Sequence, residues 1–414
     1  MLAGYKGGAA AFAMRLITEV GEAQGASCLI DITRAHVSSV YDNGPPSLDF
    51  AELMVATGAW VRVPTTLTAG SIDFVHPDLR AGSEDEQLTA RLLINLHQQM
   101  GCTVTMTCAP YLVETPPALG EHVAWSGSSA VVLANSVFGA RTERYVEFLD
   151  LCAALTGRVP DVGLHTDEGR RGTLLVHLNE LPQSLFEQDA FYQVLGYWLG
   201  SNIGSAIPVL EGLPKTVSED QLRALGAAAA TSGTVAMFHV VGVTPEAGSL
   251  GEAFGGDQPD ATQFVSLEDL AAARSLLSTP FDRHLSAVCL GSPHFSLAEF
   301  EQLLRLINGR RVDPEVNFYV TTSRHTIGQL DERDWTDTLK EAGVRLVADT
   351  CTYFGPVLDG CDGAVMTSSA KWAHYAPGNL GAQVVFGSLP ECVDSAVAGE
   401  VRHNTRLWGE ASES

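Results

Sequence analysis

Helix-like and strand-like patterns of apolar and polar positions alternate along most of the chain. Two of the predicted helices begin with a capping box, in which a Ser and a Glu three residues later satisfy the first N–H groups, at Ser83 and at Ser296. Apolar residues recurring every three to four positions predict further helices at 1–23, 47–58 and 335–343. The helical content is therefore spread along the chain and not gathered at one end.

Short apolar runs lie between these helices and read as buried strands. The predicted strands cover 59–64, 102–110, 129–135, 284–290, 344–350 and 363–368. Strands that alternate with helices are typical of parallel sheets, because each crossover needs a helix. We therefore predict an α/β fold, a multi-domain assembly of mostly parallel sheets flanked by helices. A segment rich in Gly, Pro and Asp at 245–282 indicates a junction inside the chain.

Composition and charge narrow the classes of function. The chain has 414 residues, 45% of them hydrophobic, and 25 Lys and Arg against 49 Asp and Glu, for a net charge of −24. This apolar content can form a core, and the negative charge argues against binding to nucleic acid or to an anionic membrane. Arg15 and Glu19 interrupt the N-terminal apolar run, so an amphipathic helix is favoured over a signal peptide. We expect a cytoplasmic protein.

Reactive and polar side chains gather where predicted strands end. Because ligands of open α/β sheets bind at the carboxyl ends of strands, these residues predict a shared site, although Ser, Thr and Asn also form ordinary turns. Lys371 follows an apolar strand and precedes a Pro-Gly turn, which favours an anion-holding role over a solvated one. The candidates are Thr65, Thr66, Ser71, Cys108, Asn135, Ser136, Arg141, Ser292, His294, Cys351 and Lys371.

The eight cysteines contain no CxxC spacing, so zinc-ribbon and ferredoxin motifs are absent from the sequence. Six of them, including Cys289 and Cys361, read as small apolar residues that pack in the interior. Cys108 and Cys351 differ, because both lie at predicted strand exits and could hold a metal. Without a secretory signal, reduced thiols are expected rather than disulfides.

Long segments of the chain resemble aconitase X, the large-subunit branch of the aconitase superfamily. The resemblance rests on VPTTLTAGSID, MGCTVTMTCAPYL, AVVLANSVFGARTERY, LGSPHFSLAEF, ADTCTYFGP and MTSSAKWAHYAPGNLGAQVVFGSL. It implies a dehydratase acting on a small β-hydroxy carboxylate such as cis-3-hydroxy-L-proline or mevalonate 5-phosphate. It also implies an iron–sulfur cluster, held by three cysteines in motifs that match TCAPY, LGxPH and DTC.

This chain departs from the family pattern at the second ligand. Cys108 and Cys351 match the first and third cysteines, whereas Ser292 stands where the family has cysteine. Cys289 lies inside the strand and is not expected to replace it. Three interpretations remain open: an altered or labile iron–sulfur cluster with serine ligation, a single iron, or a cluster-free protein. Gly127 and Glu143 also differ from the family wording, so the substrate is left open.

The resemblance also implies roles for the candidates. Arg141 and Lys371 would bind the anionic substrate, with Lys371 and His294 as the catalytic candidates, His294 relaying a proton or orienting a ligand. Thr65, Thr66, Ser71, Asn135 and Ser136 would orient the substrate. The whole chain, 1–414, is expected to be the large-subunit region, and the small swivelling domain is expected as a separate subunit. Competing interpretations are a cluster-free isomerase or lyase of the same fold and a non-catalytic metabolite-binding scaffold.

Overall fold

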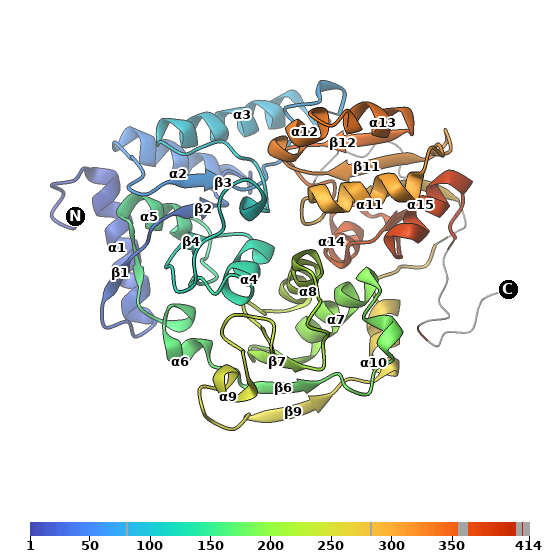
Figure 1. Ribbon diagram of the computed structural model, residues 1–414. Helices are drawn as coiled ribbons and strands as arrows, with labels where there is room; N and C mark the ends of the chain where they lie inside the picture. The colour runs from blue at the N-terminus through green and yellow to red at the C-terminus, as the bar shows by residue number, and fades with distance from the viewer. Residues whose placement is uncertain (80–81, 282–283, 355–362, 403–407, 409–414) are drawn as a thin grey trace.

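Three sheets of parallel strands organise the molecule. The computed structural model describes residues 1–79, 82–281, 284–354, 363–402 and 408, and Cys361 lies outside them. Each sheet has its own lobe in Figure 1, running from blue at the N-terminus through green and yellow to orange and red. The predicted α/β fold with mostly parallel sheets flanked by helices is confirmed.

The first lobe, residues 1–170, is built on a parallel sheet in the order β3-β2-β4 and a short antiparallel pair, β1-β5. Helix α1 packs against this pair and against α5. The elements are α1 (Gly8–Ala23), β1 (Leu29–Asp31), β2 (Ala35–Val37), α2 (Pro45–Ala56), β3 (Thr65–Leu67), α3 (Glu84–Gln99), β4 (Ala124–Trp125), α4 (Ser128–Ser136), α5 (Leu149–Thr156), β5 (Arg158–Pro160) and α6 (Asp167–Arg170).

The second lobe, residues 171–281, carries a four-stranded parallel sheet in the order β8-β7-β6-β9. Its two long helices, α7 and α8, lie together at the centre of the molecule, between this sheet and the other lobes (Figure 1). The elements are β6 (Leu174–His177), α7 (Asp189–Asn202), β7 (Pro208–Glu211), α8 (Glu219–Ser232), β8 (His239–Val240), α9 (Leu250–Ala253), β9 (Ala261–Phe264) and α10 (Leu267–Ser275).

The third lobe, residues 284–402, holds a five-stranded parallel sheet in the order β12-β11-β10-β13-β14. All six residues of its central strand β10 are buried, as expected for a strand covered on both faces. The elements are β10 (Leu285–Leu290), α11 (Leu297–Ile307), β11 (Asn317–Thr321), α12 (Arg324–Asp331), α13 (Trp335–Glu341), β12 (Val344–Val347), β13 (Ala364–Thr367), α14 (Ala370–Leu380), β14 (Gln383–Phe386) and α15 (Leu389–Ala398).

One cluster of buried side chains crosses the boundaries between the lobes. It joins Val132 of the first lobe, Phe191 of the second, and Cys289 and Trp372 of the third. Burial of apolar area from three lobes in one cluster resists their separation, because each contact surface would return to water. Loops from different lobes are therefore held in fixed positions where they meet. No helix in the described segments is long and apolar enough to cross a membrane.

Several local predictions are confirmed. The capping boxes of α3 at Ser83 and of α11 at Ser296 are both formed, with the serine hydroxyl accepting from the backbone N–H three residues on. The helices expected within 1–23, 47–58 and 335–343 are α1, α2 and α13, and the strands expected at 284–290, 344–350 and 363–368 are β10, β12 and β13. The segment 245–282 contains β9 and α10 of the second lobe.

The predicted strand at 129–135 is wrong, because these residues form helix α4. Eight of its nine residues, from Ser129 to Ser136, are buried, so the segment lacks the polar face that reveals a helix in a sequence. A short, fully apolar run has the same pattern in a buried strand and in a buried helix. Asn135 and Ser136 accordingly lie in the last turn of a helix and not after a strand.

The strand predicted at 59–64 is also wrong, because the backbone there bonds to the ends of helices. Val61 N–H donates to Met100 O at 2.9 Å and Arg62 N–H donates to Ala154 O at 2.8 Å, and strand β3 begins only at Thr65. Thr65 and Thr66 therefore lie within a strand.

The segment 102–110 forms a single β-bridge, Thr66 with Thr103, instead of the predicted strand. The hydroxyl of Thr105 then replaces the backbone ladder, accepting from Leu67 N–H at 3.1 Å and donating to Leu67 O at 2.7 Å. Met106 has a positive φ of 47°, which no strand contains. This turn directs the following residues, Thr107 and Cys108, toward the third lobe.

Candidate functional site

Loops of the first and third lobes bring two thiols and an imidazole together. Cys108 lies just before a short 3₁₀ turn at Pro110–Leu112, His294 lies in the loop between β10 and α11, and Cys351 follows β12. Their Sγ and ring nitrogen atoms lie within 4.8 Å of one another, and all three residues are buried. Residues separated by more than 180 positions thus form one cluster of soft donor atoms, of the kind that binds transition metals.

The two thiols differ in their tendency to ionise. A hydrogen bond with Cys351 lowers the pKa of the Cys108 thiol well below its ordinary value, and the Lys371 ammonium and the His294 backbone N–H act in the same direction. That N–H donates to Cys108 Sγ at 3.3 Å. The same hydrogen bond, together with burial, raises the pKa of Cys351. Of the two thiols, Cys108 therefore loses its proton more readily than Cys351.

The ring of His294 is held on both of its nitrogen atoms. Nδ1 lies 3.0 Å from Thr107 Oγ1, and Nε2 lies 3.1 Å from the carbonyl oxygen of Thr350. Because a carbonyl oxygen only accepts, Nε2 carries the proton and Nδ1 accepts from the Thr107 hydroxyl. The imidazole therefore joins the Cys108 loop to the Cys351 loop, and binding a metal through it would break one of these bonds.

Ser292 lies in the same loop as His294 and is also buried. Its Oγ has no hydrogen-bond partner of good geometry among the described residues, although its proximity lowers the pKa of the Cys351 thiol. Its backbone oxygen accepts a hydrogen bond from Ser369 Oγ, the N-cap residue of α14. A buried hydroxyl without a firm partner is uncommon in folded proteins, and this one lies beside a thiol of the cluster.

Lys371, in the first turn of α14, is the cation of this region. Its side chain is 7% exposed, and its Nζ donates to Ser128 Oγ at 3.5 Å. No carboxylate lies within ion-pair distance of it in the described parts of the chain. Burial of an ammonium group is costly unless an anion balances it, and Lys371 lies close enough to Cys108 to lower the pKa of its thiol. The structure thus brings Lys371, Cys108, Ser292, His294 and Cys351 together.

The helix that carries Ser128 adds partial positive charge. Helix α4 begins after Gly127, whose φ of 89° favours glycine, and it has neither a side-chain cap nor an acidic residue in its first turn. Ser129 is 1% exposed, and its Oγ has no partner among the described residues. The N-terminus of a helix favours anions because its first N–H groups lack acceptors.

Aromatic rings close one side of the cluster. Tyr41 lies 4.5 Å from Phe354 between ring centroids, and Tyr353 stacks on Tyr375 at 5.3 Å. Tyr353 is buried, and burial raises the pKa of its phenol. Burial, and in addition the nearby Cys351, raises the pKa of both Tyr41 and Tyr353, so both rings lie near this thiol.

Three predicted substrate residues of the first lobe have partners of their own. Thr65 Oγ1 donates to Val63 O at 2.9 Å, and Thr66 Oγ1 lies 2.9 Å from His36 Nδ1. Ser71 Oγ accepts from the backbone N–H of Asp42 at 3.2 Å. These bonds shape the 65–71 segment, which the backbone bond from Gly70 N–H to Asp349 O ties to the third lobe.

Asn135, Ser136 and Arg141 face other partners than the thiols. The Asn135 side chain bonds to the backbone of Thr142 and accepts from Arg170, and Ser136 Oγ accepts from Phe238 N–H at 2.9 Å. Arg141 donates to His165 O at 2.9 Å and pairs with Asp167. These contacts give the three residues a structural setting at the boundary of the first and second lobes.

The sequence analysis did not single out Ser128 or Arg223 as site residues. In the sequence, Ser128 looked like an ordinary turn residue. Because the following segment was predicted as a strand, its position at the start of helix α4 was not recognised. Arg223 lies inside helix α8, 71 residues before His294 and in no recognisable motif, so only the fold brings it to the loop of His294. The one feature of the sequence that pointed to Ser128 was the Gly-Ser-Ser sequence before an apolar run.

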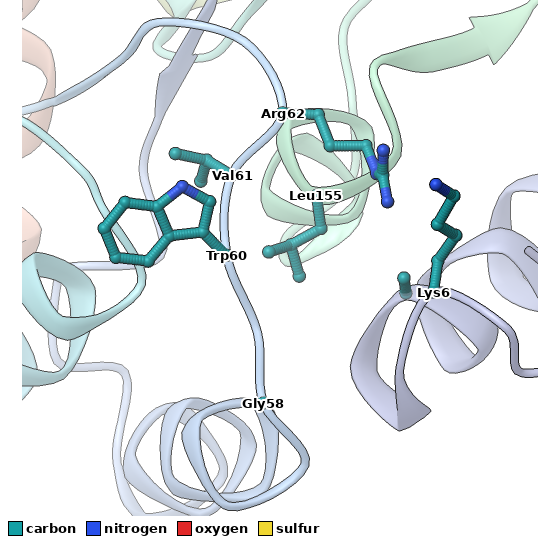
Figure 2. Close-up of a pocket in the computed structure, with 7 residues that line it drawn as sticks. Lys6, Gly58, Trp60, Val61, Arg62 and Leu155 are labelled. Carbon is teal, nitrogen blue, oxygen red and sulfur yellow. The ribbon is translucent and has the colours of Figure 1, made fainter.

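Two surface cavities lie apart from the thiols. One, of about 300 Å³, is lined by Lys6, Trp60 and Arg62; Figure 2 shows Lys6 and Arg62 extending toward the same space and Trp60 extending the other way. None of the predicted site residues lines it. The other, of about 280 Å³, lies between the second and third lobes and is lined in part by Asp220 and Glu299.

Family models for aconitase X match the chain in three consecutive pieces that follow the three lobes. The model for the aconitase X first domain matches residues 1–168, that for the second domain residues 172–275, and that for the third domain residues 285–398. The thiol cluster therefore joins residues of the first and third of these domains.

Full-length comparisons agree. Cis-3-hydroxy-L-proline dehydratase of Pseudomonas aeruginosa is 43% identical over 411 residues, which are 99% of this chain and 70% of that protein. The phosphomevalonate dehydratase large subunit of Methanothermobacter thermautotrophicus is 37% identical over 377 residues, 90% of this chain and 91% of that subunit. The crystal structure of Thermococcus kodakaraensis aconitase X in its holo-form superposes with a TM-score of 0.84 at 30% identity, covering 95% of this chain and 97% of that one. The chain belongs to the aconitase X family.

Proposed function

We propose that this protein is a dehydratase that eliminates water from a small β-hydroxy carboxylate of the cis-3-hydroxy-L-proline class. The observation that carries the proposal is the buried set of Cys108, Ser292 and Cys351 beside the Lys371 ammonium. The names of the similar proteins, which are dehydratases, support the reaction class. The higher identity to the hydroxyproline enzymes favours their substrate class over a phosphorylated one.

The donor set fits a soft metal group. A stabilised Cys108 thiolate, a neighbouring Cys351 thiol and the hydroxyl of Ser292 would hold an iron–sulfur cluster of altered ligation or a single iron. Serine is a harder ligand than cysteine, so we expect this group to be labile. When bound, it would supply a Lewis acid for the departing hydroxyl group. His294 then holds the loops of Cys108 and Cys351 in register and is not itself a ligand.

Lys371 and the start of α4 would bind the substrate carboxylate. Lys371 supplies a full charge, Ser128 a hydroxyl and the first turn of α4 its free N–H groups, all facing a buried region. Holding the carboxylate there also stabilises the negative charge that develops when the neighbouring proton is removed. In a chain of net charge −24, this local positive region gives an anionic substrate a defined place.

The relatives suggest that the site is completed either by a separate subunit or by additional residues of the same chain. The archaeal relatives are named as large subunits, whereas the Pseudomonas dehydratase is longer than the region that this chain matches. We propose that a small partner subunit closes over the thiol cluster and supplies the remaining acid–base group. A reducing cytoplasm suits such a protein, because ligand thiols must stay reduced.

The direct test is anaerobic purification of the chain, followed by iron and sulfide analysis, a visible spectrum and turnover of cis-3-hydroxy-L-proline with and without a family small subunit. The proposal expects bound iron that is lost in Cys108→Ala and Cys351→Ala, and turnover that depends on the added subunit. A colourless, iron-free protein that still eliminates water would support a cluster-free lyase instead. A protein that binds substrate analogues but shows no turnover under any condition would support a binding scaffold.

A further inference from the structure

One buried guanidinium of the second lobe contacts the loop that carries Ser292 and His294. Arg223, on α8, is 3% exposed, and its Nη1 donates to the carbonyl oxygen of His294 at 2.8 Å. Its Nη2 pairs with Glu299 of α11 and with Asp220 of its own helix, the latter at 2.8 Å. A fixed, planar fork of donors thus holds a backbone oxygen and two carboxylates at once.

Residue 294 contacts all three lobes. Its carbonyl accepts from Arg223 of the second lobe, its N–H donates to Cys108 of the first lobe, and its ring bonds to Thr107 and Thr350. Any shift of this residue moves the N–H that donates to Cys108 Sγ. It also moves Ser292, two positions earlier, relative to Cys351.

The two carboxylates that pair with Arg223 hold its guanidinium at this loop. Asp220 accepts from Ser296 Oγ at 2.8 Å, and Glu299 accepts from Ser296 N–H at 2.8 Å, so both carboxylates are tied to the start of α11. The carboxylates border the cavity between the second and third lobes, whereas the guanidinium is enclosed. With two carboxylates already paired to it, Arg223 has no charge left for a substrate anion.

We infer that Arg223 is a positioning residue for the thiol site: it fixes the backbone at His294 so that Cys108, Cys351 and Ser292 keep the spacing that a metal group requires. The inference rests on the proposed function only in taking these three residues as the ligand set. Among the described residues, the second lobe contributes no donor atom to the cluster of Cys108, His294 and Cys351, and its contacts with that loop include Arg223 at His294 and Asp220 at Ser296.

Arg170 provides a matched control. It is also 3% exposed and also joins two lobes, pairing with Glu246 at 2.9 Å and donating to Asn135, but its bonds lead to α4 and the Leu164 carbonyl and not to the thiol loops. Replacing either arginine removes a buried ion pair and destabilises the fold. Only Arg223 should alter the metal site.

The experiment measures Co²⁺ binding to the reduced, metal-free full chain, followed by the thiolate-to-cobalt absorption band, with the melting temperature measured alongside. Arg223→Gln should weaken Co²⁺ binding about 10–100-fold, as the loss of partners around metal ligands does, and should shift the band. Arg223→Lys, which keeps the charge but loses the fork, should fall between it and the wild type. Arg170→Gln should lower the melting temperature and leave cobalt affinity and spectrum unchanged.

Two results would overturn the inference. One is wild-type cobalt binding in both Arg223 variants; if Arg223→Gln does not fold, wild-type binding in Arg223→Lys alone is sufficient. The other is equal weakening by Arg170→Gln, which would mean that the arginines only hold the lobes together. Cobalt binding needs no substrate and no partner subunit, so failure of this inference is distinguishable from failure of the dehydratase proposal, which turnover decides.

Discussion

Ser292 gives this chain its distinctive chemistry at the scale of single residues. Its buried hydroxyl lies beside Cys351, at the position that matches the second of the three cysteines in the resembling family motifs. A hydroxyl binds iron less firmly than a thiolate, because it is a harder donor and resists deprotonation. A metal group held by Cys108, Ser292 and Cys351 would therefore be more labile than one held by three cysteines.

Ser292→Cys should therefore retain iron longer than the wild type. The change adds a thiol beside Cys351 in the same buried loop, at little cost in volume. The measurement is iron per chain after timed exposure of anaerobically prepared protein to air. Ser286→Cys, which adds a buried cysteine at the other end of β10, is the control and should leave the rate of iron loss unaltered. Equal loss in all three proteins would contradict a ligand role for position 292.

Lys371→Met should reduce kcat/KM about 30-fold or more, because truncating one partner of a buried charge pair costs about 2–5 kcal/mol. The reason is that the substrate carboxylate would lose its one full counter-charge in a water-excluded region. Steady-state kinetics measure the effect. Lys340→Met, at an exposed position of α13, is the matched control and should leave kcat/KM unchanged. An unaltered kcat/KM in Lys371→Met would remove the carboxylate role.

At the scale of elements, a network of carboxylates ties the first lobe to the end of β12. Asp349 is fully buried with a positive φ of 65°, accepts both hydrogen bonds of the Arg324 fork at 2.6 Å, and accepts from Phe74 N–H. Asp73 reaches across in the opposite direction and accepts from Ala348 N–H at 2.8 Å. Cys351 lies two residues beyond Asp349, so these bonds fix the position of the Cys351 thiol after the end of β12.

Arg324→Met should destabilise the protein by about 1–3 kcal/mol, because the buried Asp349 carboxylate would lose its charged partner. Urea unfolding measures the free energy change. Arg305→Met is the control, since Arg305 forms an exposed pair with Glu301 one helical turn away, worth about 0.5 kcal/mol or less. Equal effects of the two substitutions would show that the Asp349 pair behaves as an ordinary surface pair.

Some of these helices and strands could be predicted from the sequence pattern, and others could not. Strand β10 and helix α11 were predictable because apolar strand, loop and capping box follow one another within a few residues. Helix α4 was not, because burial on every side removes the periodicity that separates a helix from a strand. The 102–110 segment was not, because the hydroxyl of Thr105 replaces the backbone ladder.

At the scale of the whole molecule, several histidines are buried in neutral form. Burial lowers the pKa of both His36 and His165 from 6.5 to about 3, and it also lowers the pKa values of His97 and His239. In the unfolded chain these groups take up protons below about pH 6.5. The unfolded state therefore binds more protons than the folded state between that pH and about pH 3, and acid favours unfolding.

The free energy of unfolding should accordingly fall as the pH drops from 7.5 to 5.0, by about 2 kcal/mol for each of His36 and His165. Urea titrations at the two pH values measure it. The partly exposed His76 acts in the opposite sense, since its hydrogen bond to Asp73 raises its pKa and stabilises the fold below that value. His36→Asn should flatten the pH dependence, whereas His325→Asn, at an exposed position, should not. Equal stability at both pH values would contradict the prediction.

The sequence by itself determined the fold class, the capped helices and the strands of the third lobe, and it marked Cys108 and Cys351 as candidate metal ligands. These features depend on local periodicity, on capping chemistry, or on motifs a few residues long. The acidic composition also set apart Lys371 as a cation in an apolar setting. Nothing at longer range was needed for any of them.

Only the tertiary structure decided which candidates meet. It placed Lys371 beside Ser128 and the thiols, turned Asn135 and Arg141 toward backbone partners, and brought Arg223 of the second lobe to the carbonyl of His294. The physical reason is that these contacts join residues far apart in sequence, through the packing of three separate sheets. Short-range patterns carry no record of how separate lobes pack, so the spacing of the thiol site is a property of the assembled molecule.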